Sequence, residues 1–189
     1  MKKFNVKIES ITPYMQHRMD DTKLEEWEKT HSRVVTRPEV SQADATRAEY
    51  HCYRNKDGQC YLPADQLRGA MITAGTYVKA KVGAQTKSMK SIVAGQWMVS
   101  PAEIIIPDYD EIDKRSAVNK NVKARVITVR PKWSKLETTF QLEVDNDSTT
   151  KEMVEQILTY AGNNVGIGSF RPTNNGLFGR FKIVSVKEI

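Results

Sequence analysis

The feature that most restricts the fold is a glycine-rich stretch, residues 161–183, which reads AGNNVGIGSFRPTNNGLFGRFKI. It contains five of the ten glycines in the sequence, and no acidic residue occurs between Asn163 and Lys187. A helical pattern leads into it and a strand pattern follows it. Glycine tolerates positive φ, and successive backbone N–H groups can form an anion-binding concavity. The stretch therefore favours a loop that contacts a phosphate backbone, with an ordinary glycine-rich connection as the alternative.

Length and composition indicate one globular domain. The chain has 189 residues, of which 39% are hydrophobic, enough for a real core. No apolar run approaches the roughly 20 residues of a membrane helix. The N-terminal residues lack the apolar segment of a signal peptide, so we expect a cytoplasmic protein without membrane association. Cys52 and Cys60 could close a small disulfide loop, but two cysteines without an export signal fit a reducing cytoplasm better.

The basic residues are segregated from the acidic ones, and the net charge is +6. Two long stretches, residues 66–102 and 114–136, contain basic residues but no acidic ones. The basic residues of the first are Arg68, Lys79, Lys81, Lys87 and Lys90, and those of the second are Lys114, Arg115, Lys120, Lys123, Arg125, Arg130, Lys132 and Lys135. This pattern predicts a positive face for a polyanion.

Hydrophobic periodicity predicts the order of the elements. Alternation predicts strands at residues 4–8, 122–128, 136–144 and 181–186, and helical spacing predicts helices at residues 64–80 and 149–161. We expect the second and third strands to form a hairpin around residues 130–134. Without two insertions, at about residues 12–63 and 82–121, the order is strand, helix, strand, strand, helix, strand.

This order predicts a single α+β domain over residues 1–189 with a ferredoxin-like βαββαβ core, an antiparallel sheet with both helices on one face. Inside the insertions we expect a short charged helix at residues 22–30 and a turn at residues 55–58. We also expect residues 96–99 and 103–106 to pair as accessory strands, and residues 108–121 to be irregular.

Three stretches on this scaffold resemble the RAMP superfamily, the repeat-associated proteins of CRISPR effector complexes. Residues 6–13, VKIESITP, are similar to the family's opening strand, which ends at Thr-Pro. Residues 61–70, YLPADQLRGA, resemble the entry to its first helix, and residues 166–183 resemble its closing glycine-rich loop and strand. Within this superfamily, the chain is most similar to the backbone subunits that coat guide RNA. Residues 15–18, MQHR, also look similar to phage proteins of this general shape.

The resemblance implies a single-stranded RNA-binding domain, with RNA favoured over DNA. Its glycine loop and first helix, near Arg68, Arg171 and Arg180, would lie against the nucleic-acid backbone. The outward residues of the predicted central strands are polar and include no aromatic ring, which excludes base stacking on the sheet face.

Aromatic residues in loops remain as candidates for base stacking. Trp133 lies among basic residues at the predicted hairpin tip, where it would stack a base or pack against its own hairpin. Phe170 and Phe178 fit the core better. The expected nucleic-acid-binding residues are Arg68, Lys123, Arg125, Arg130, Lys132, Trp133, Lys135, Gly166, Gly168, Arg171, Gly176, Gly179 and Arg180.

Two alternatives stay open beside a nucleic-acid coat that works in several copies. The first is a metal-independent ribonuclease, since a histidine beside a cation could cleave RNA at its 2′-hydroxyl, and His17, His31 and His51 lie in the first insertion. No metal-binding or nucleotide-binding motif is present, so we expect no cofactor and no metal. The second is an assembly protein that contacts copies of itself or other subunits through the acidic residues 21–28.

Overall fold

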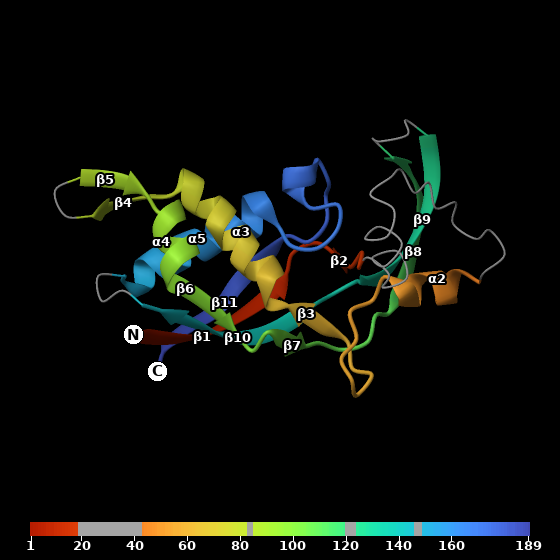
Figure 1. Cartoon of the computed structure of the whole chain (residues 1–189), viewed down its shortest axis with the longest axis horizontal. Coiled ribbons are helices and arrows are strands. Elements are labelled where there is room, and N and C mark those ends of the chain that lie inside the picture. Colours follow the sequence, from red (N-terminus) through yellow and green to blue (C-terminus); the bar gives the residue numbers. More distant parts are fainter. Residues whose placement is uncertain (19–42, 83–84, 120–123, 146–148) are drawn as a thin grey trace, which may run out of the picture.

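The computed structural model of the chain describes residues 1–18, 43–82, 85–119, 124–145 and 149–189 (Figure 1). Within these ranges it is a mixed α/β protein whose strand pairs are antiparallel. No helix in them has the length and apolar character that crossing a membrane requires. The expected helix at residues 22–30, His31 and Lys123 lie outside the described residues.

The central element is a four-stranded sheet with the strand order β11-β1-β10-β6. Its strands are β1 (Lys2–Ser10), β6 (Trp97–Ser100), β10 (Glu137–Val144) and β11 (Phe181–Glu188). In β1, Phe4, Val6 and Ile8 alternate with polar residues, which gives the strand one apolar face. The register places Val6 opposite Phe140 and Phe4 opposite Leu142, so the apolar faces of the two central strands coincide.

Both edges of this sheet carry features that limit further strand pairing. β6 has only four residues. β11 pairs with β1 through a register shift next to Lys7 and Ile8, and its exposed residues include Lys182 and Lys187. Short strands, irregular register and lysines are devices by which edge strands avoid pairing with other chains.

Two helices, α3 (Ala64–Tyr77) and α5 (Lys151–Tyr160), cover the apolar face of the sheet (Figure 1). In α3, Leu67, Ala70, Met71 and Ala74 are buried, the spacing of a helix with one apolar face. α5 begins at Thr150, whose side chain accepts a hydrogen bond from the next turn of the helix and so satisfies one of its free N–H groups. The helices predicted at residues 64–80 and 149–161 exist, but the first ends at Tyr77 and is followed by a strand from Lys79, and the second has its cap one residue later than expected.

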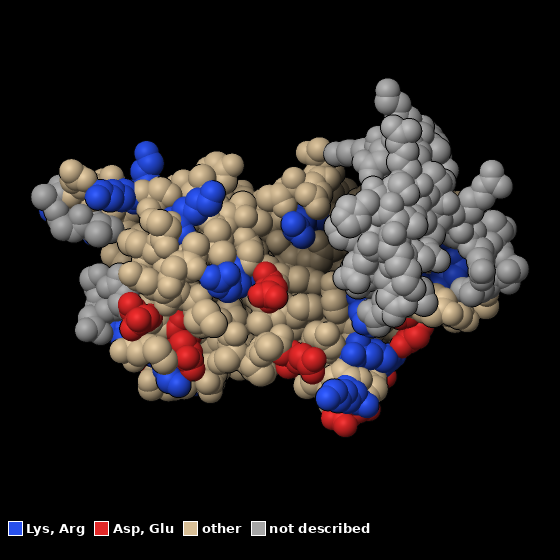
Figure 2. Space-filling view, in the orientation of Figure 1, with Lys and Arg blue, Asp and Glu red and all other residues tan. Residues whose placement is uncertain are grey.

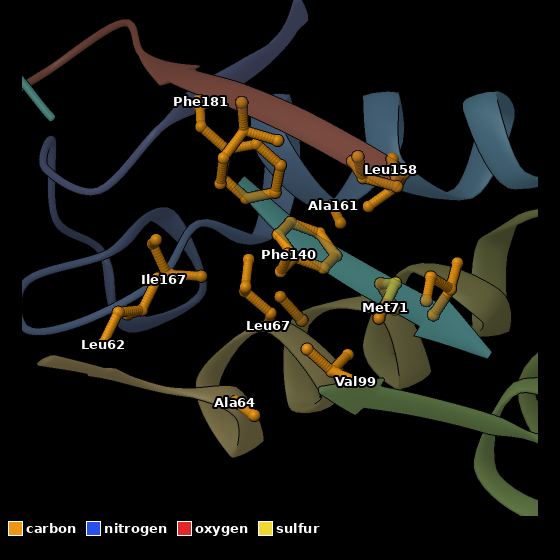
Figure 3. Packing of buried hydrophobic residues seen from close by; sticks show 14 of the residues in the cluster. Leu62, Ala64, Leu67, Met71, Val99, Phe140, Leu158, Ala161, Ile167 and Phe181 are labelled. Atoms are coloured by element: carbon orange, nitrogen blue, oxygen red, sulfur yellow. The ribbon is translucent and has the colours of Figure 1, made fainter. Parts of the chain in front are cut away.

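The core lies between these helices and the sheet. Figure 3 shows Leu67 and Met71 of α3, Phe140 of β10, Leu158 of α5 and Phe181 of β11 in one apolar layer, and all five are buried. Burial of a side chain of this size contributes about 1.5–3 kcal/mol. On the opposite face of the sheet, the outward residues of β1 and β10 are polar, and Asn5, Thr139 and Gln141 are exposed.

The predicted hairpin between residues 122–128 and 136–144 is wrong. β9 (Ala124–Trp133) pairs with β8 (Glu111–Asn119) and β2 (Tyr14–Met15) in a separate three-stranded sheet. The edge of β10 is occupied by β6, which brings the buried Trp97 and Val99 into the main core. Alternation identifies a strand but not its partner, and here burial of Trp97 selects the partner. A strand of the main sheet therefore lies within residues 82–121, which we had expected to be an insertion.

The smaller strands also pair differently from the prediction. β7 (Glu103–Ile105) pairs with β3 (Tyr61–Pro63) and not with residues 96–99, so the expected accessory pair is wrong. β8 covers most of the stretch expected to be irregular. β4 (Lys79–Val82) and β5 (Gln85–Ser88) form a hairpin that extends beyond the helices at one end of the molecule (Figure 1). The two short helices are α2 (Asp44–Tyr50) and α4 (Lys90–Gln96).

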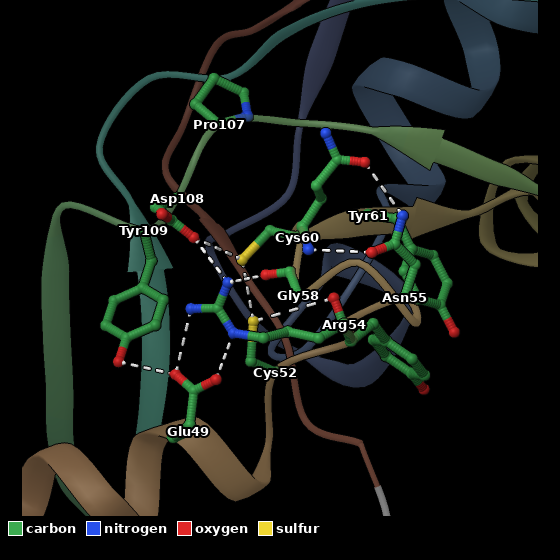
Figure 4. A network of polar contacts seen from close by, with 12 residues as sticks. Glu49, Cys52, Arg54, Asn55, Gly58, Cys60, Tyr61, Pro107, Asp108 and Tyr109 are labelled. Carbon is green, nitrogen blue, oxygen red and sulfur yellow. Dashed lines mark hydrogen bonds and ion pairs between the residues drawn. The ribbon is translucent and has the colours of Figure 1, made fainter.

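A polar network fixes the segment that precedes α3 (Figure 4). Arg54 lies at its centre, where Nη1 donates to a carboxylate oxygen of Asp108 and to the carbonyl oxygen of Gly58, both at 2.7 Å. Its guanidinium also pairs with Glu49 at the end of α2. The hydrogen bond from Arg54 is the main cause that holds the pKa of Asp108 below its usual range. The network therefore joins α2, the predicted turn at residues 55–58 and the segment after β7.

The two cysteines lie beside this network as free thiols. Their Sγ atoms are 3.2 Å apart and both residues are buried. Burial raises the pKa of both thiols, so the reactive thiolate form is scarce at neutral pH.

We predict opposite effects for alanine at two helical glycines. A Cβ at Gly162 would lie 2.0 Å from the carbonyl oxygen of Phe181, whereas a Cβ at Gly69 would meet nothing within 4 Å. Gly162→Ala should lower the free energy of unfolding by about 1–3 kcal/mol because the backbone must shift. Gly69→Ala should raise it by about 0.5–1 kcal/mol, because alanine favours the helix. Urea unfolding of both variants measures this, and equal stabilities would contradict the packing at Gly162.

Candidate nucleic-acid interface

The glycine-rich loop after α5 packs against its own chain. α5 continues into a π-helical turn, η1 (Ala161–Val165), and a short 3-10 turn, η2 (Pro172–Asn174), follows. A Cβ at Gly168 would lie 2.4 Å from the carbonyl oxygen of Met15, and one at Gly179 would lie 1.8 Å from that of Ile167. Both glycines have φ near +73°, so both the close approach and the backbone conformation require glycine.

The backbone N–H groups at the centre of this loop are used inside the protein. Ser169 N–H donates to the carbonyl oxygen of Met15 at 2.9 Å, and Gly179 N–H donates to that of Pro13 at 2.8 Å. Phe178 N–H donates to the carbonyl oxygen of Phe170 at 3.1 Å. These donors therefore hold the loop on β2, and what the loop presents to a ligand is mainly its side chains.

Two arginines of the loop are on its surface. Arg171 is half-buried, and its guanidinium donates to the carbonyl oxygen of Gly168 at 3.2 Å and to the Thr173 hydroxyl at 3.0 Å. Arg180 is exposed. Neither has an ion pair with an acidic residue in the part of the chain that the structure describes. Both are positioned to contact an anion outside the protein.

The loop meets β8 and β9 in a cluster of arginines and phenylalanines. The guanidinium carbon of Arg130 lies 4.5 Å from the ring centre of Phe170, and that of Arg115 lies 4.8 Å from the ring centre of Phe178. Phe170 has φ of 54°, a left-handed conformation that is uncommon for a bulky residue. Cation–π contacts of this kind attach the loop to the second sheet.

Arg130 itself is buried and does not lie on the open surface where the sequence predicts it. It is 6% exposed, and its Nη1 has no hydrogen-bond partner within the described residues. Burial lowers its pKa. Its Nε donates to Nδ1 of His17 at 3.1 Å, which leaves His17 with its proton on Nε2 if the ring is neutral.

His17 and His51 lie together. Their rings stack with centres 4.2 Å apart, and Nδ1 of His51 is 2.8 Å from the carbonyl oxygen of Arg18. A carbonyl only accepts, so Nδ1 of His51 carries a proton. The structure thus stacks two of the three histidines on each other and places one of them, His17, beside a buried arginine, an arrangement that the sequence alone did not predict.

The basic residues expected on the hairpin are largely neutralised by acidic partners. Lys132 pairs with Glu111 of the neighbouring strand, and Lys135 pairs with Glu9 at 2.8 Å. The hydrogen bonds from these lysines lower the pKa of Glu111 and Glu9. Arg125 lies on β9 in register with Val118. Two lysines of the stretch that is most basic in sequence are therefore ion-paired with acidic residues.

Trp133 and Arg68 are structural residues. Trp133 is 1% exposed, its Nε1 donates to the carbonyl oxygen of Pro107 at 2.7 Å, and its ring packs on Tyr14 with centres 5.3 Å apart. Trp133 is therefore not the exposed side chain expected at a hairpin tip, because distant segments cover it. Arg68 donates to the carbonyl oxygens of Ala94 and Trp97, which satisfies the end of α4.

The lysines around the β4–β5 hairpin have no such partners. Lys79, Lys81, Lys87 and Lys90 are exposed, and none has an ion pair within the described residues. In Figure 2, blue side chains without red ones occupy the region over β4 and β5 at the upper left. The sequence signal for this surface was the absence of acidic residues between residues 66 and 102.

Comparisons with known proteins do not assign the chain to a family. No family model matches the chain, and the search of curated proteins finds no match either. Among the residues that the structure describes, no group of three or more histidine, cysteine or acidic side chains is arranged to hold a metal ion. The charges and contacts described above are therefore the observations that bear on a nucleic-acid interface.

We predict that Trp133→Phe separates stability from binding. The variant loses the hydrogen bond to Pro107 and some core volume, so the free energy of unfolding should fall by about 1–3 kcal/mol. Affinity for single-stranded RNA should not change at a temperature where the variant is folded. Thermal unfolding and fluorescence anisotropy measure the two effects, and a large loss of affinity with unchanged stability would restore Trp133 as a contact residue.

Proposed function

We propose that this protein binds single-stranded nucleic acid, RNA in preference to DNA, through its glycine-rich loop and a basic face. The elements of the main sheet and its helices follow the order β1-α3-β6-β10-α5-β11, with sheet order β11-β1-β10-β6. This order supports a ferredoxin-like core, although its second strand is β6 and not residues 122–128.

The resemblance to the RAMP superfamily supports RNA as the ligand. Its three stretches meet around Tyr14 in this chain. The carbonyl oxygen of Pro13 accepts from Gly179 N–H at 2.8 Å, and the hydroxyl of Tyr14 donates to the side chain of Gln66 at 3.0 Å. Segments that carry a shared sequence pattern and also contact each other are consistent with one functional unit. We propose a RAMP-like protein that works in several copies along a strand.

The observation that carries the proposal is the distribution of cations without acidic partners. On the open face of the sheet three lysines are ion-paired, Lys3 with Glu143, Lys7 with Glu137 and Lys182 with Glu9, and one exposed lysine near the end of β11, Lys187, has no ion pair within the described residues. The arginines of the loop and the lysines of the β4–β5 hairpin have no ion pair within the described residues. A polyanion gains most where it releases counterions from unpaired cations, so the strand should follow the loop and the hairpin and avoid the sheet face.

We predict that Arg171→Ala combined with Arg180→Ala weakens binding of a labelled single-stranded RNA while the protein stays folded. If both side chains contact phosphates, the slope of log affinity against log salt should become shallower by about 1.4. Fluorescence anisotropy over a salt series gives both values. Unchanged affinity in a folded double variant would remove the glycine loop from the interface.

We predict a larger effect for the hairpin. Lys79→Gln, Lys81→Gln and Lys87→Gln together should make the salt slope shallower by about 2.1 if each lysine contacts a phosphate. The matched control replaces Lys3, Lys7 and Lys135 with glutamine, which removes the same charge from residues that are ion-paired with glutamates. Equal losses in both triple variants would mean that net charge, and not the hairpin, governs affinity.

The stacked histidines favour ribonuclease activity as a second candidate function. His17 lies beside Arg130 and stacks on His51, and an imidazole next to a cation can move a proton to or from a 2′-hydroxyl. The same RNA, run on a denaturing gel after the binding experiment, tests it. RNA cleaved by the protein but left intact by His51→Gln would assign a nuclease, and intact RNA in both samples supports a binding protein.

A further inference from the structure

A groove lies beside the end of α5. It has a volume of about 530 Å³ and is lined by Val78, Tyr160, Asn163 and Asn164, among others. Sites for small organic groups fall in the range of roughly 300–1,000 Å³. The groove borders the start of the β4–β5 hairpin, next to the lysines to which we assign phosphate contacts.

One aromatic ring, that of Tyr160, lines the groove. Tyr160 stacks on Tyr77 with ring centres 5.3 Å apart and an angle of 16° between the rings. Tyr77 is 64% exposed, so this pair is not explained by core formation alone. Successive bases of a single strand stack on aromatic residues of this kind, because every base has a π-face.

The helical segment that carries Tyr160, α5 and η1, also presents amides to the groove. Gln156, Asn163 and Asn164 line it and are exposed. Their side chains form no hydrogen bond with any residue that the structure describes. An amide carries both donors and an acceptor, the set that matches the edge of a nucleobase.

The two asparagines lie three and four residues after Tyr160, positions that share one face of a helix. They lie in the π turn η1, which continues α5. π turns of this kind occur frequently at functional sites. The turn places Gly162 against the backbone of β11, where a Cβ would clash, and consecutive Asn163 and Asn164 both line the groove.

Two carboxylates also line the groove, and both have partners of their own. Glu155 forms an ion pair with Lys151 at 3.7 Å. Glu152 interacts with backbone N–H groups and with Thr150 at the start of α5, which lowers its pKa. The groove is therefore suited to the neutral base of a nucleotide and not to its phosphate.

We propose that this groove binds one nucleobase of the bound strand. The base extends the Tyr77–Tyr160 stack, the amides bond its edge, and the phosphates on either side of it lie on Lys79, Lys81 and Lys87. The proposal rests on the proposed function, since it names the part of the strand that the β4–β5 end of the interface holds.

The test compares two single strands of equal length and phosphate count, an oligoribonucleotide and an oligomer of abasic linkers. Tyr160→Leu removes the ring but keeps an apolar side chain of branched shape. It should weaken binding of the oligoribonucleotide between about 5-fold and about 150-fold, the range for loss of one base stack. Binding of the abasic oligomer should not change. Tyr50→Leu, at a half-exposed tyrosine of α2, is the matched control.

A second variant tests the same proposal if Tyr160→Leu does not fold. Asn163→Ala combined with Asn164→Ala alters only exposed side chains, and it should reduce the difference in affinity among homopolymers of A, C, G and U at least fivefold. The proposal is overturned if both variants bind base-containing RNA as the wild type does while the hairpin lysine variant loses affinity. That outcome would leave the proposed function standing. Failure of the wild type to bind any strand would overturn both.

Discussion

The packing around Tyr14 is the constraint on which the other parts of the molecule depend. This residue is buried between the loop, the helix layer and the second sheet, and burial raises its pKa. Its hydroxyl donates to Gln66 of α3, its ring contacts Trp133 of β9, and Gly168 lies against it where any larger residue would collide. The two-residue strand β2 therefore holds together three elements that lie far apart in sequence: α3, β9 and the glycine-rich loop.

That constraint explains why the glycines gather near the end of the chain. A loop that lies on β2 and also returns to β11 must bring its own backbone close to Met15 and to Ile167. Side chains at Gly168 and Gly179 would prevent both approaches. The glycines thus determine the backbone path of the loop, and this path sets the positions of its arginine and phenylalanine side chains.

Local patterns in the sequence predict the elements well and their partners poorly. Alternation of Phe4, Val6 and Ile8 and the helical spacing of α3 are signals within single segments, and the structure agrees with them. The choice of β6 as the partner of β10 depends on the burial of Trp97, which is a property of the assembled core. The two strands and the core residues that surround Trp97 come from separate parts of the sequence, so no short segment reveals the pairing.

The candidate interface shows the same limit. Whether a lysine is available to a ligand depends on which acid faces it, and Lys132 faces Glu111 only because β8 and β9 pair in one register. Trp133 is hidden by Tyr14 and Tyr109, which come from separate segments. The absence of acids near Lys79 and Lys81 was visible in the sequence because their hairpin is local.

The edges of the main sheet determine how copies of the protein can meet. β6 is too short to template a new strand, and the lysines and shifted register of β11 oppose a neighbour there. The edges of the main sheet therefore oppose its growth from one copy into the next. In an assembly of several copies along one strand, the main sheets would stay separate, so release of the strand would not have to break backbone pairing between them.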